Sequence, residues 1–377
     1  MTIGVAVLGS TGSIGRSTLQ VLARQRDRFR VVAITGHSNK DLLAQQAAEW
    51  QPAFVGLVNG GTGDGGRGKG TSCLVEAATH PDVRIVVNGI VGAAGLEATL
   101  AALRAGKRVA LANKETLVMA GELVAQAARD GGGEIVPVDS EHSAVLQCVA
   151  GRRPTELARL ILTASGGPFR TWDPERVSRA TVAEALKHPT WTMGKKITVD
   201  SATLVNKALE VIEAHFLFAV DYHQVDVVIH PQSVIHGFAE FVDGSVLAQV
   251  GFPTMELPIL YALTYPDRVP DQGVRRFDPV AAGTLTFEAL QPGRFPAYVV
   301  GREAARQGGT APARFNAANE VAVQLFLEEK ITFGRIAEII EHVVGRGTGD
   351  AGSGTSLEAV LAADAEARRQ AQEVACS

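Results

Sequence analysis

The chain has 377 residues, of which 46% are hydrophobic and 20% are charged, so it is globular in composition and long enough for two or three domains. Lys and Arg number 36 against 40 Asp and Glu, giving a net charge of -4. This balance excludes a broad electrostatic attraction for nucleic acid or an anionic membrane, so any anion site must be local.

The cysteines and the first residues bear on the cellular compartment. Cys73, Cys148 and Cys376 are odd in number, widely spaced and without metal-ligand spacing, as expected in a reducing cytosol. The opening MTIGVAVLGSTGSIG has no basic leader and no apolar run long enough to span a bilayer. We therefore expect a cytoplasmic protein with neither a membrane nor a nucleic acid as its partner.

The first half of the chain alternates apolar strands with amphipathic helices. Helices are predicted at 17–23, at 41–50 and after residue 88, and strands at 3–8, 29–35, 53–58, 85–88, 109–112 and 134–138. Such alternation predicts a parallel sheet covered by helices. The glycine-rich segments 59–70 and 345–354 predict flexible surface loops.

The second half of the chain has a mixed pattern. Strands are predicted at 160–164 and 225–229, a hairpin at 238–250 around Asp243-Gly244, and helices at 317–329 and 333–344. We predict an α/β fold class with three parts. These are a Rossmann-like dinucleotide-binding domain at 1–138, a central α/β catalytic and metal-binding domain at 139–264 and, after a linker at 265–295, a C-terminal helical domain at 296–377.

A glycine turn joins the first strand to the first helix. Gly9, Gly12 and Gly15 recur every third residue, which lets backbone amides and the helix N-terminus approach a pyrophosphate. The alternative is a turn that serves packing alone. After the second strand, residues 35–40 contain no carboxylate to bind ribose hydroxyls, which favours NADP over NAD.

Carboxylates gather in two distant segments. Asp139 and Glu141 lie two residues apart at a predicted strand end, where they could converge on a cation or merely cap the helix that follows. Glu210 lies beside Asn206 and Lys207 on one predicted helix face, although its pair with Lys207 could be an ordinary surface ion pair. Three carboxylates without a thiolate suit Mg²⁺ or Mn²⁺.

Two further segments suit an anionic substrate. Residues 163–169, TASGGPF, end a strand with a hydroxyl and glycine amides, which can form either an anion nest or only a tight turn. Residues 182–196 hold His188, Trp191 and Met193 among lysines in a predicted loop. We predict a lid that excludes water and brings His188 to a phosphate; the alternative is that Trp191 and Met193 anchor the loop on the core.

Six motifs occur together in one order: GSTGSIG at 9–15, LANKE at 111–115, PVDSEH at 137–142, SGGPF at 165–169, HPTWTMGKKITVDSATLVNKALEVIEA at 188–214 and HPQSVIH at 230–236. Through them residues 3–345 resemble the 1-deoxy-D-xylulose-5-phosphate reductoisomerase family. The resemblance implies NADPH-dependent isomerisation and reduction of that sugar phosphate to 2-C-methyl-D-erythritol 4-phosphate, in isoprenoid precursor synthesis. It also implies Mg²⁺ or Mn²⁺ as cofactor and a homodimer.

The resemblance implies roles for individual residues as well. It assigns NADPH binding to Thr11, Gly12, Ser13, Ile14, His37, Ser38, Asn39, Asn113, Glu115 and Gly194. It assigns the metal to Asp139, Glu141 and Glu210, and catalysis to Lys114, Lys207 and Glu141. Substrate binding falls to Lys114, Ser140, Glu141, Ser165, His188, Trp191, Met193, Ser201, Asn206, Lys207 and Glu210, with Ser165, His188, Ser201 and Asn206 mainly at the phosphate.

Three positions depart from the family's pattern. His37 stands where a small residue is common, Ser38 where some members have a basic residue, and Glu256 where Arg or Lys is frequent.

Two other classes of protein are alternatives to this family. An NADP-dependent aldehyde or semialdehyde dehydrogenase shares the glycine turn but usually relies on a nucleophilic cysteine, and none of the three cysteines has a suitable motif. A dinucleotide-sensing module would need neither clustered carboxylates nor a lid.

Overall fold

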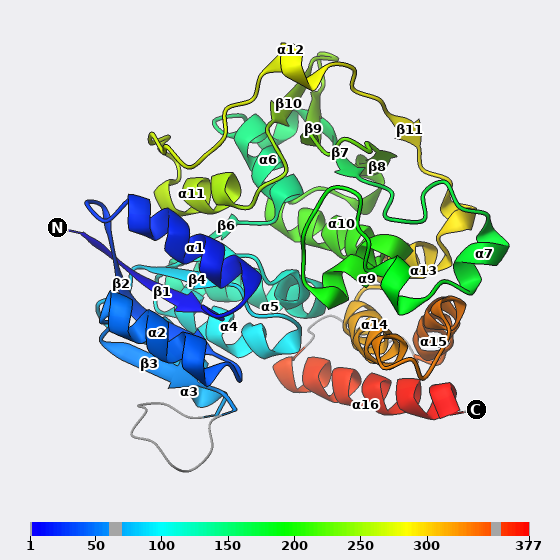
Figure 1. Cartoon of the computed structure of the whole chain (residues 1–377), viewed down its shortest axis with the longest axis horizontal. Helices are drawn as coiled ribbons and strands as arrows, with labels where there is room; N and C mark the ends of the chain where they lie inside the picture. Colours follow the sequence, from blue (N-terminus) through cyan, green and yellow to red (C-terminus); the bar gives the residue numbers. More distant parts are fainter. Residues whose placement is uncertain (1, 60–69, 348–355, 377) are drawn as a thin grey trace. The chain divides into compact units, whose positions relative to one another are not determined.

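The computed structural model describes residues 2–59, 70–347 and 356–376, and its contacts divide the chain into two compact units (Figure 1). The first unit comprises residues 1–116, 122–143 and 254–276, and the second comprises 117–121, 144–253 and 277–377. Most of the two predicted glycine-rich loops lies outside the described residues. The predicted domain boundaries stay a prediction. No helix in the described part of the chain has both the length and the apolar character needed to cross a membrane.

A six-stranded parallel sheet with the order β3-β2-β1-β4-β5-β6 forms the core of the first unit. The central strand β1 is fully buried from Val5 to Leu8, as expected of a parallel sheet with helices on both faces. The strands are β1 (Ile3–Leu8), β2 (Phe29–Gly36), β3 (Phe54–Leu57), β4 (Ile85–Asn88), β5 (Arg108–Leu111) and β6 (Glu134–Pro137). The helices are α1 (Ser13–Arg24), α2 (Lys40–Trp50), α3 (Ser72–Thr79), η1 (Ala93–Gly95), α4 (Leu96–Arg104), α5 (Lys114–Gly131) and α11 (Glu256–Thr264).

The strand order decides where polar side chains meet in this unit. The chain runs outward in one direction from β1 and in the other from β4, and ligands of such sheets bind at the carboxyl ends of the strands beside that reversal. The glycine turn follows β1, His37 follows β2, Asn113 follows β5 and Asp139 follows β6. The predicted parallel sheet is therefore confirmed, and it brings the predicted polar residues of this unit to one edge.

The second unit holds a five-stranded mixed sheet with the order β10-β9-β7-β8-β11. Strands β7 (Leu157–Ala164) and β8 (Val225–Ile229) are parallel, and β9 (Ile235–Phe241) is antiparallel to β7 and to β10 (Val246–Val250), which confirms the predicted hairpin. The short β11 (Glu288–Ala289) pairs with β8. The second unit also contains most of α6 (Ser140–Val149), together with η2 (Pro154–Glu156), α7 (Pro174–Ser178), α8 (Val182–Ala185), η3 (Tyr222–Gln224), α12 (Pro279–Ala282) and η4 (Pro292–Arg294).

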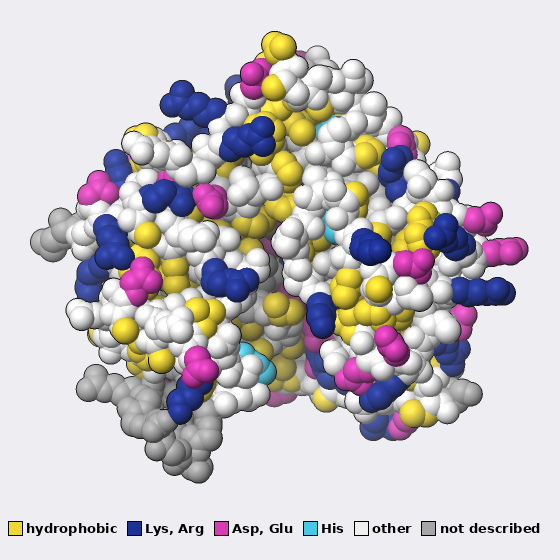
Figure 2. Space-filling model, viewed as in Figure 1, with side chains coloured by type: hydrophobic (Ala, Val, Ile, Leu, Met, Phe, Trp, Pro, Cys, Tyr) yellow, Lys and Arg dark blue, Asp and Glu magenta, His cyan; other side chains and the backbone are white. Residues whose placement is uncertain are grey.

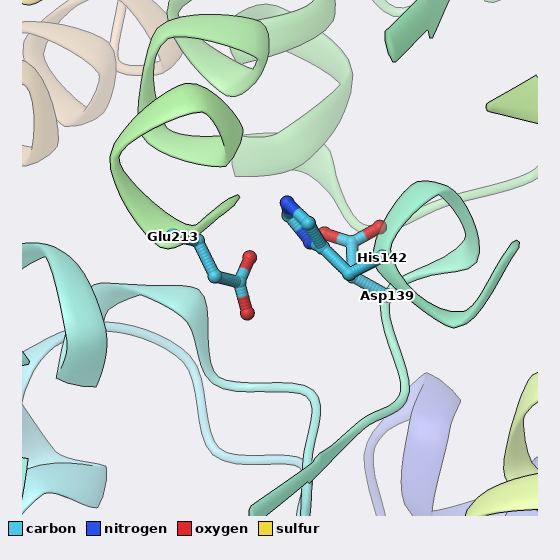
Figure 3. A group of neighbouring side chains, drawn as sticks. All are labelled: Asp139, His142 and Glu213. Atoms are coloured by element: carbon cyan, nitrogen blue, oxygen red, sulfur yellow. The ribbon is translucent and has the colours of Figure 1, made fainter. Parts of the chain in front are cut away.

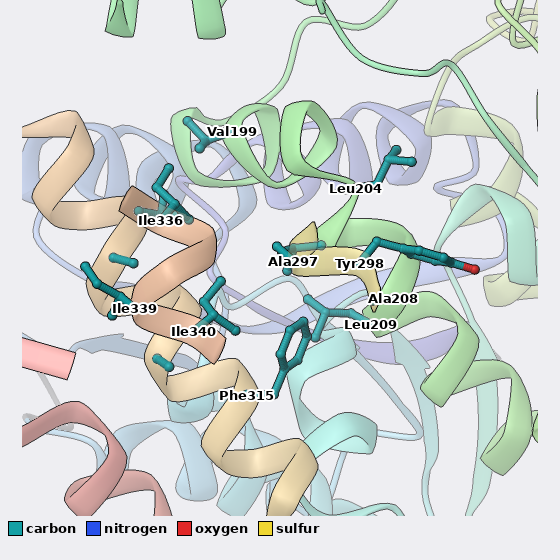
Figure 4. Packing of buried hydrophobic residues seen from close by; sticks show 14 of the residues in the cluster. Val199, Leu204, Ala208, Leu209, Ala297, Tyr298, Phe315, Ile336, Ile339 and Ile340 are labelled. Carbon is teal, nitrogen blue, oxygen red and sulfur yellow. The ribbon is translucent and has the colours of Figure 1, made fainter. Parts of the chain in front are cut away.

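Helices dominate the rest of the second unit. α9 (Lys195–Thr203) and α10 (Val205–Phe218) share a buried apolar cluster with α13 (Pro296–Gln307), α14 (Ala311–Leu327) and α15 (Phe333–Gly345), and α16 (Leu357–Cys376) packs on α14 (Figure 4). Gly301 lets α13 pack closely on α14 and α10. An added Cβ would lie 2.5 Å from Phe315 Cζ on α14 and 2.6 Å from Ala208 Cβ on α10. The predicted helical C-terminal part is confirmed.

Candidate functional site

The turn after β1 presents backbone amides at the start of α1. Gly9 has a φ of 77°, and its amide donates to Thr35 Oγ1 at 3.2 Å. An added Cβ at Gly15 would overlap the carbonyl oxygen of Gly9 and the Cα of Ser10. Gly12 precedes the helix without a side-chain cap, so the first amides of α1 remain available for an anion. The glycine turn thus serves packing, and it leaves the start of α1 free of a side-chain cap.

The residues after β2 are exposed and therefore accessible to a cofactor. His37, Ser38 and Asn39 are all exposed, and Asn39 Oδ1 accepts the amide of Leu42 at 3.1 Å as the N-cap of α2. Asn39 therefore has a local structural task, which leaves its Nδ2 as the group that can donate to a phosphate. The chain offers no carboxylate here, in keeping with a 2′-phosphate.

Asn113 lies in the protein interior and not on an open surface. It is fully buried, and its Nδ2 donates to the carbonyl oxygens of Ile90 and Gly92, both at 2.9 Å, and to Glu115 Oε2 at 3.1 Å. Thr116 Oγ1 donates to its Oδ1. The side chain thus fixes the loop after β4.

Acidic groups follow β6 in the first unit. Asp139 and Glu141 have carboxylate oxygens within 4.8 Å of each other. Their predicted convergence is confirmed, but the predicted cause, alternation along a strand, is wrong. β6 ends at Pro137, and Glu141 lies in the first turn of α6, which starts at Ser140. The chain turn brings the two carboxylates together.

Lys114 supplies the positive charge for this acidic group. Its ammonium forms an ion pair with Asp139 Oδ2, and the Lys114 side chain is only 8% exposed. Ser140 Oγ donates to Glu141 Oε2. A cation buried beside a carboxylate contributes far more electrostatic interaction than an exposed pair, since little water screens it.

Sequence reasoning did not single out His142. One of its ring nitrogens lies within 4.8 Å of an Asp139 carboxylate oxygen, and the residue is fully buried. Figure 3 shows the two side chains next to each other at the start of α6, and it also draws Glu213 of α10. The PVDSEH motif contains this histidine, but nothing in the spacing distinguished it from a core residue.

Three residues of α10 form a second polar group, in the second unit. Glu210 is fully buried and accepts hydrogen bonds from Asn206 Nδ2 and Lys207 Nζ. Lys207 is 2% exposed, so this is no surface ion pair, and the predicted common helix face is confirmed. Glu213, one turn further on and also fully buried, was not predicted as a functional residue. Its i, i+3 spacing from Glu210 was the available signal.

Ser165 and His188 form the candidate phosphate site in the second unit. Ser165 lies after β7, and its Oγ accepts the amide of Gly167 at 3.1 Å and lies 2.9 Å from His188 Nε2. Gly166 and Gly167 have φ values of 83° and 67°, which a residue with a Cβ rarely adopts. With two donors directed at its oxygen, the Ser165 hydroxyl can give its own proton to an anion.

The protonation of His188 follows from its neighbours. Its Nδ1 accepts the amides of Thr190 at 3.2 Å and Trp191 at 2.9 Å, so the ring proton lies on Nε2. Burial lowers the pKa of His188 from 6.5 to about 4. The imidazole is therefore neutral at ordinary pH and donates from Nε2 toward Ser165 and any ligand beside it.

The predicted lid differs in part from the observed segment. Residues 186–194 carry no helix or strand, but 182–185 form α8 and Lys195 begins α9, so the prediction of one loop over 182–196 is wrong at both ends. The Trp191 ring lies 5.9 Å from the His236 ring, and Thr190 Oγ1 donates to the carbonyl oxygen of Pro231 at 3.3 Å. Trp191 and Met193 are both half-buried, and neither belongs to the apolar core cluster.

Glu256 has a local explanation. Its Oε2 accepts Arg24 Nη2 at 2.7 Å, while Arg24 Nε donates to Asp271 Oδ1 at the same distance. The unexpected carboxylate at this position thus pairs with an arginine of α1, inside the first unit. Sequence alone could not reveal this partner, because 232 residues separate the two side chains.

A parallel sheet in this order, with a glycine turn at the end of its first strand, defines the class of dinucleotide-binding α/β proteins. Family models described as 1-deoxy-D-xylulose 5-phosphate reductoisomerase match residues 5–62 and 66–121, its C-terminal domain matches 135–218, and a DXP reductoisomerase C-terminal domain matches 250–370. The chain belongs to the 1-deoxy-D-xylulose 5-phosphate reductoisomerase family.

Individual relatives cover nearly the whole chain. The reductoisomerase of Ralstonia nicotianae is 49% identical over 98% of this chain and 97% of its own length, and that of Geobacter sp. strain M21 is 50% identical over 98% of both. A crystal structure of the enzyme with NADPH, fosmidomycin and magnesium has a TM-score of 0.95 at 41% identity, covering 99% of this chain and 98% of its own. The Zymomonas mobilis enzyme with NADPH has a TM-score of 0.91 at 41% identity, covering all of both chains.

Proposed function

We propose that the chain converts 1-deoxy-D-xylulose 5-phosphate to 2-C-methyl-D-erythritol 4-phosphate with NADPH and a divalent cation. Family membership supports the reaction, as do related structures that hold NADPH and magnesium. The observation that carries the proposal is the pair of buried ion pairs Lys114–Asp139 and Lys207–Glu210, one in each unit. Buried charges of this kind are costly, and they gather at functional sites.

We assign the cation to Asp139, Glu141 and Glu210. All three offer carboxylate oxygens, and no cysteine belongs to the group, so the donors fit Mg²⁺ or Mn²⁺. Magnesium is the ion named in related structures, and manganese is proposed from donor chemistry alone. Lys114 and Lys207 would balance the carboxylates in the absence of substrate.

NADPH is assigned to Thr11, Gly12, Ser13, Ile14, His37, Ser38, Asn39, Asn113, Glu115 and Gly194. The amides at the start of α1 suit its pyrophosphate, and the carboxylate-free segment after β2 suits its 2′-phosphate. When bound, NADPH supplies the hydride and the divalent cation stabilises negative charge on substrate oxygens.

The protein's own residues bind and orient the sugar phosphate. Ser165 and neutral His188 donate to the phosphate, with Ser201 and Asn206 nearby along α9 and α10. Ser140, Lys114 and Lys207 hold the reacting end, where the two ammonium groups stabilise oxygen charge as carbon–carbon bonds break and form. Trp191 and Met193 cover the substrate and exclude water, and phosphate binding contributes remote energy to the reaction.

A homodimer and a cytoplasmic location are further parts of the proposal. Strand β10 is the edge of its sheet and exposes Val246, Leu247 and Val250, next to exposed Val242. Figure 2 shows hydrophobic side chains gathered over β9 and β10. An apolar sheet edge of this kind suits pairing with a second copy of the chain.

Sedimentation should show a dimer, and Leu247→Lys should raise the dissociation constant of that dimer. A monomeric wild type would contradict the proposed homodimer. The three free cysteines agree with the cytoplasm.

The decisive experiment follows NADPH absorbance with the sugar phosphate before and after chelation. We expect turnover that stops with EDTA and returns with excess Mg²⁺. Turnover that survives chelation would favour a metal-independent dehydrogenase, and NADPH binding without turnover would favour a sensing module.

Asp139→Asn and Glu210→Gln should nearly abolish turnover while the dissociation constant of NADPH stays unchanged. Wild-type rates in either variant would overturn the metal assignment.

A further inference from the structure

Helix α9 connects the lid to the phosphate-binding residues. It begins at Lys195, directly after the lid residue Gly194, and carries Ser201 in its second turn. It ends at Thr203, and the C-cap residue Leu204, with a left-handed φ of 56°, redirects the chain into α10 and Asn206. The rotation of α9 about its axis therefore sets the positions of both Ser201 and Asn206. The inference below rests on the proposed phosphate site.

A buried polar contact attaches α9 to α14. Asp200 is 1% exposed, and its Oδ1 accepts Asn319 Nδ2 at 2.8 Å. Its Oδ2 pairs with Lys196 Nζ at 2.9 Å, one turn earlier on α9. Asn319 is fully buried on α14. This contact accompanies the apolar packing of Val199 and Leu204 on α9, drawn in Figure 4.

The chemistry of this contact favours orientation over stability. A buried carboxylate costs free energy unless it is paired, and apolar residues of similar volume often stabilise a core as well or better. Apolar contacts, however, are not directional, so Val199 and Leu204 alone tolerate small rotations of the helix. A hydrogen bond from a fixed amide to a fixed carboxylate weakens steeply with angle and so defines the rotation.

Gly167 packs closely against the backbone of α9. An added Cβ at Gly167 would lie 2.7 Å from the carbonyl oxygen of Ser201 and 3.0 Å from the Cα of Ala202. Gly167 also donates its amide to Ser165 Oγ. A small rotation of α9 would thus displace Ser201 relative to Ser165, and both are proposed phosphate ligands.

We propose that Asn319 and Asp200 are positioning residues for phosphate recognition. Asn319 holds Asp200, which in turn fixes α9, so that Ser201 faces the phosphate together with Ser165 and His188. Neither Asn319 nor Asp200 is among the residues assigned to substrate or cofactor. The helical C-terminal part of the chain thereby contributes to substrate affinity from a distance.

Asn316 provides a matched control one turn away. It too is a fully buried asparagine on α14, but its Nδ2 donates to Glu320 Oε1 on its own helix at 3.1 Å. Asn319→Ala and Asn316→Ala should therefore lose comparable stability, measured by thermal unfolding. Only Asn319→Ala should weaken binding of inorganic phosphate, roughly tenfold, by analogy with the lower end of the loss caused by removing a group that orients a metal ligand. Its KM for the sugar phosphate should rise in parallel, and its NADPH affinity should not change.

An exchange of the two side chains tests the contact itself and does not depend on the alanine variant folding. Asp200→Asn and Asn319→Asp should each weaken phosphate binding, and the double variant, which restores an amide facing a carboxylate, should recover part of the loss. Equal phosphate affinity in Asn319→Ala, Asn316→Ala and wild type would overturn the proposal, as would a double variant no better than the singles. A wild type that binds no phosphate would instead overturn the proposed phosphate site itself, and this inference with it.

Discussion

Gly12 and Gly15 lie in the same turn but face different neighbours. At Gly15 an added Cβ meets the backbone of Gly9 and Ser10, whereas at Gly12 it approaches only the carbonyl oxygen of Gly9, at 3.2 Å. Gly15→Ala should therefore lower the free energy of unfolding by about 1–3 kcal/mol, as overpacking does. Gly12→Ala should cost less stability than Gly15→Ala, because its single close contact is longer, and it should weaken NADPH binding, because the added methyl group would lie at the proposed pyrophosphate site.

Urea unfolding and NADPH titration of these two variants measure both effects. Equal stability loss in the two variants would contradict the packing explanation. Unchanged NADPH affinity in Gly12→Ala would contradict the close approach of the cofactor to the turn.

His188 makes stability depend on pH in a defined direction. Its pKa is lowered by burial from 6.5 to about 4, so between these values the unfolded chain binds a proton that the folded chain does not. The contribution of the neutral ring to stability is complete above about pH 6.5 and declines as the pH falls toward 4. Asn at this position keeps an acceptor for the amides of Thr190 and Trp191 but does not titrate.

The free energy of unfolding of wild type and His188→Asn should therefore converge as the pH is lowered from 7 toward 4, the lowered pKa of the imidazole. Urea titrations across this range provide the measurement. A difference between the two proteins that stays constant with pH would show that the imidazole does not have a lowered pKa.

At the scale of elements, Trp172 and Trp191 allow a comparison of a tryptophan packed on the core with one proposed to cover the substrate. Trp172 packs on the apolar core cluster, with its ring 4.7 Å from Phe169, whereas Trp191 lies in residues 186–194 and contacts His236. Trp191→Ala should raise KM about tenfold, a loss of about 1.4 kcal/mol, with little change in thermal stability. Trp172→Ala should lower stability by about 3 kcal/mol.

Steady-state kinetics and thermal unfolding of both variants test this distinction. A loss of stability in Trp191→Ala as large as that expected of Trp172→Ala would instead show that Trp191 anchors its loop on the core.

The sequence predicted the positions of helices and strands where apolar residues recur with a clear helical or strand period. The parallel sheet, the hairpin and helices α14 and α15 were predictable, because buried strands and amphipathic helices leave a clear apolar pattern. The bounds of helix α16 were not predicted, since its buried face mixes small and polar residues, among them Ala367, Ala371 and Asp364, and gives a weak contrast. The short helix α8 was assigned to the lid, because four residues show no period.

The site was predictable in its residue types but not in its internal contacts. Spacing indicated that Glu210 faces Asn206 and Lys207, and the structure confirms it. The contacts of Asn319 with Asp200 and of Arg24 with Glu256 join residues more than 100 positions apart. Such pairs depend on tertiary packing, which local patterns do not encode.

At the scale of the whole molecule, the proposed activity requires that Asp139, Glu141 and Glu210 bind a divalent cation. Asp139 and Glu141 follow β6, and Glu210 lies on α10. Glu213 is the natural control for Glu210, since it is equally buried on the same helix, one turn further along. Circular dichroism of each variant first establishes that it is folded.

The most direct test is the dissociation constant of Mn²⁺, measured by electron paramagnetic resonance for wild type, Asp139→Asn, Glu141→Gln, Glu210→Gln and Glu213→Gln. We predict that the first three variants each weaken binding by more than the roughly 10–100-fold typical of an outer-shell partner, and that Glu213→Gln weakens it less. Wild-type Mn²⁺ affinity in Glu210→Gln, or an equal loss in Glu213→Gln, would contradict the assignment of the cation to Asp139, Glu141 and Glu210.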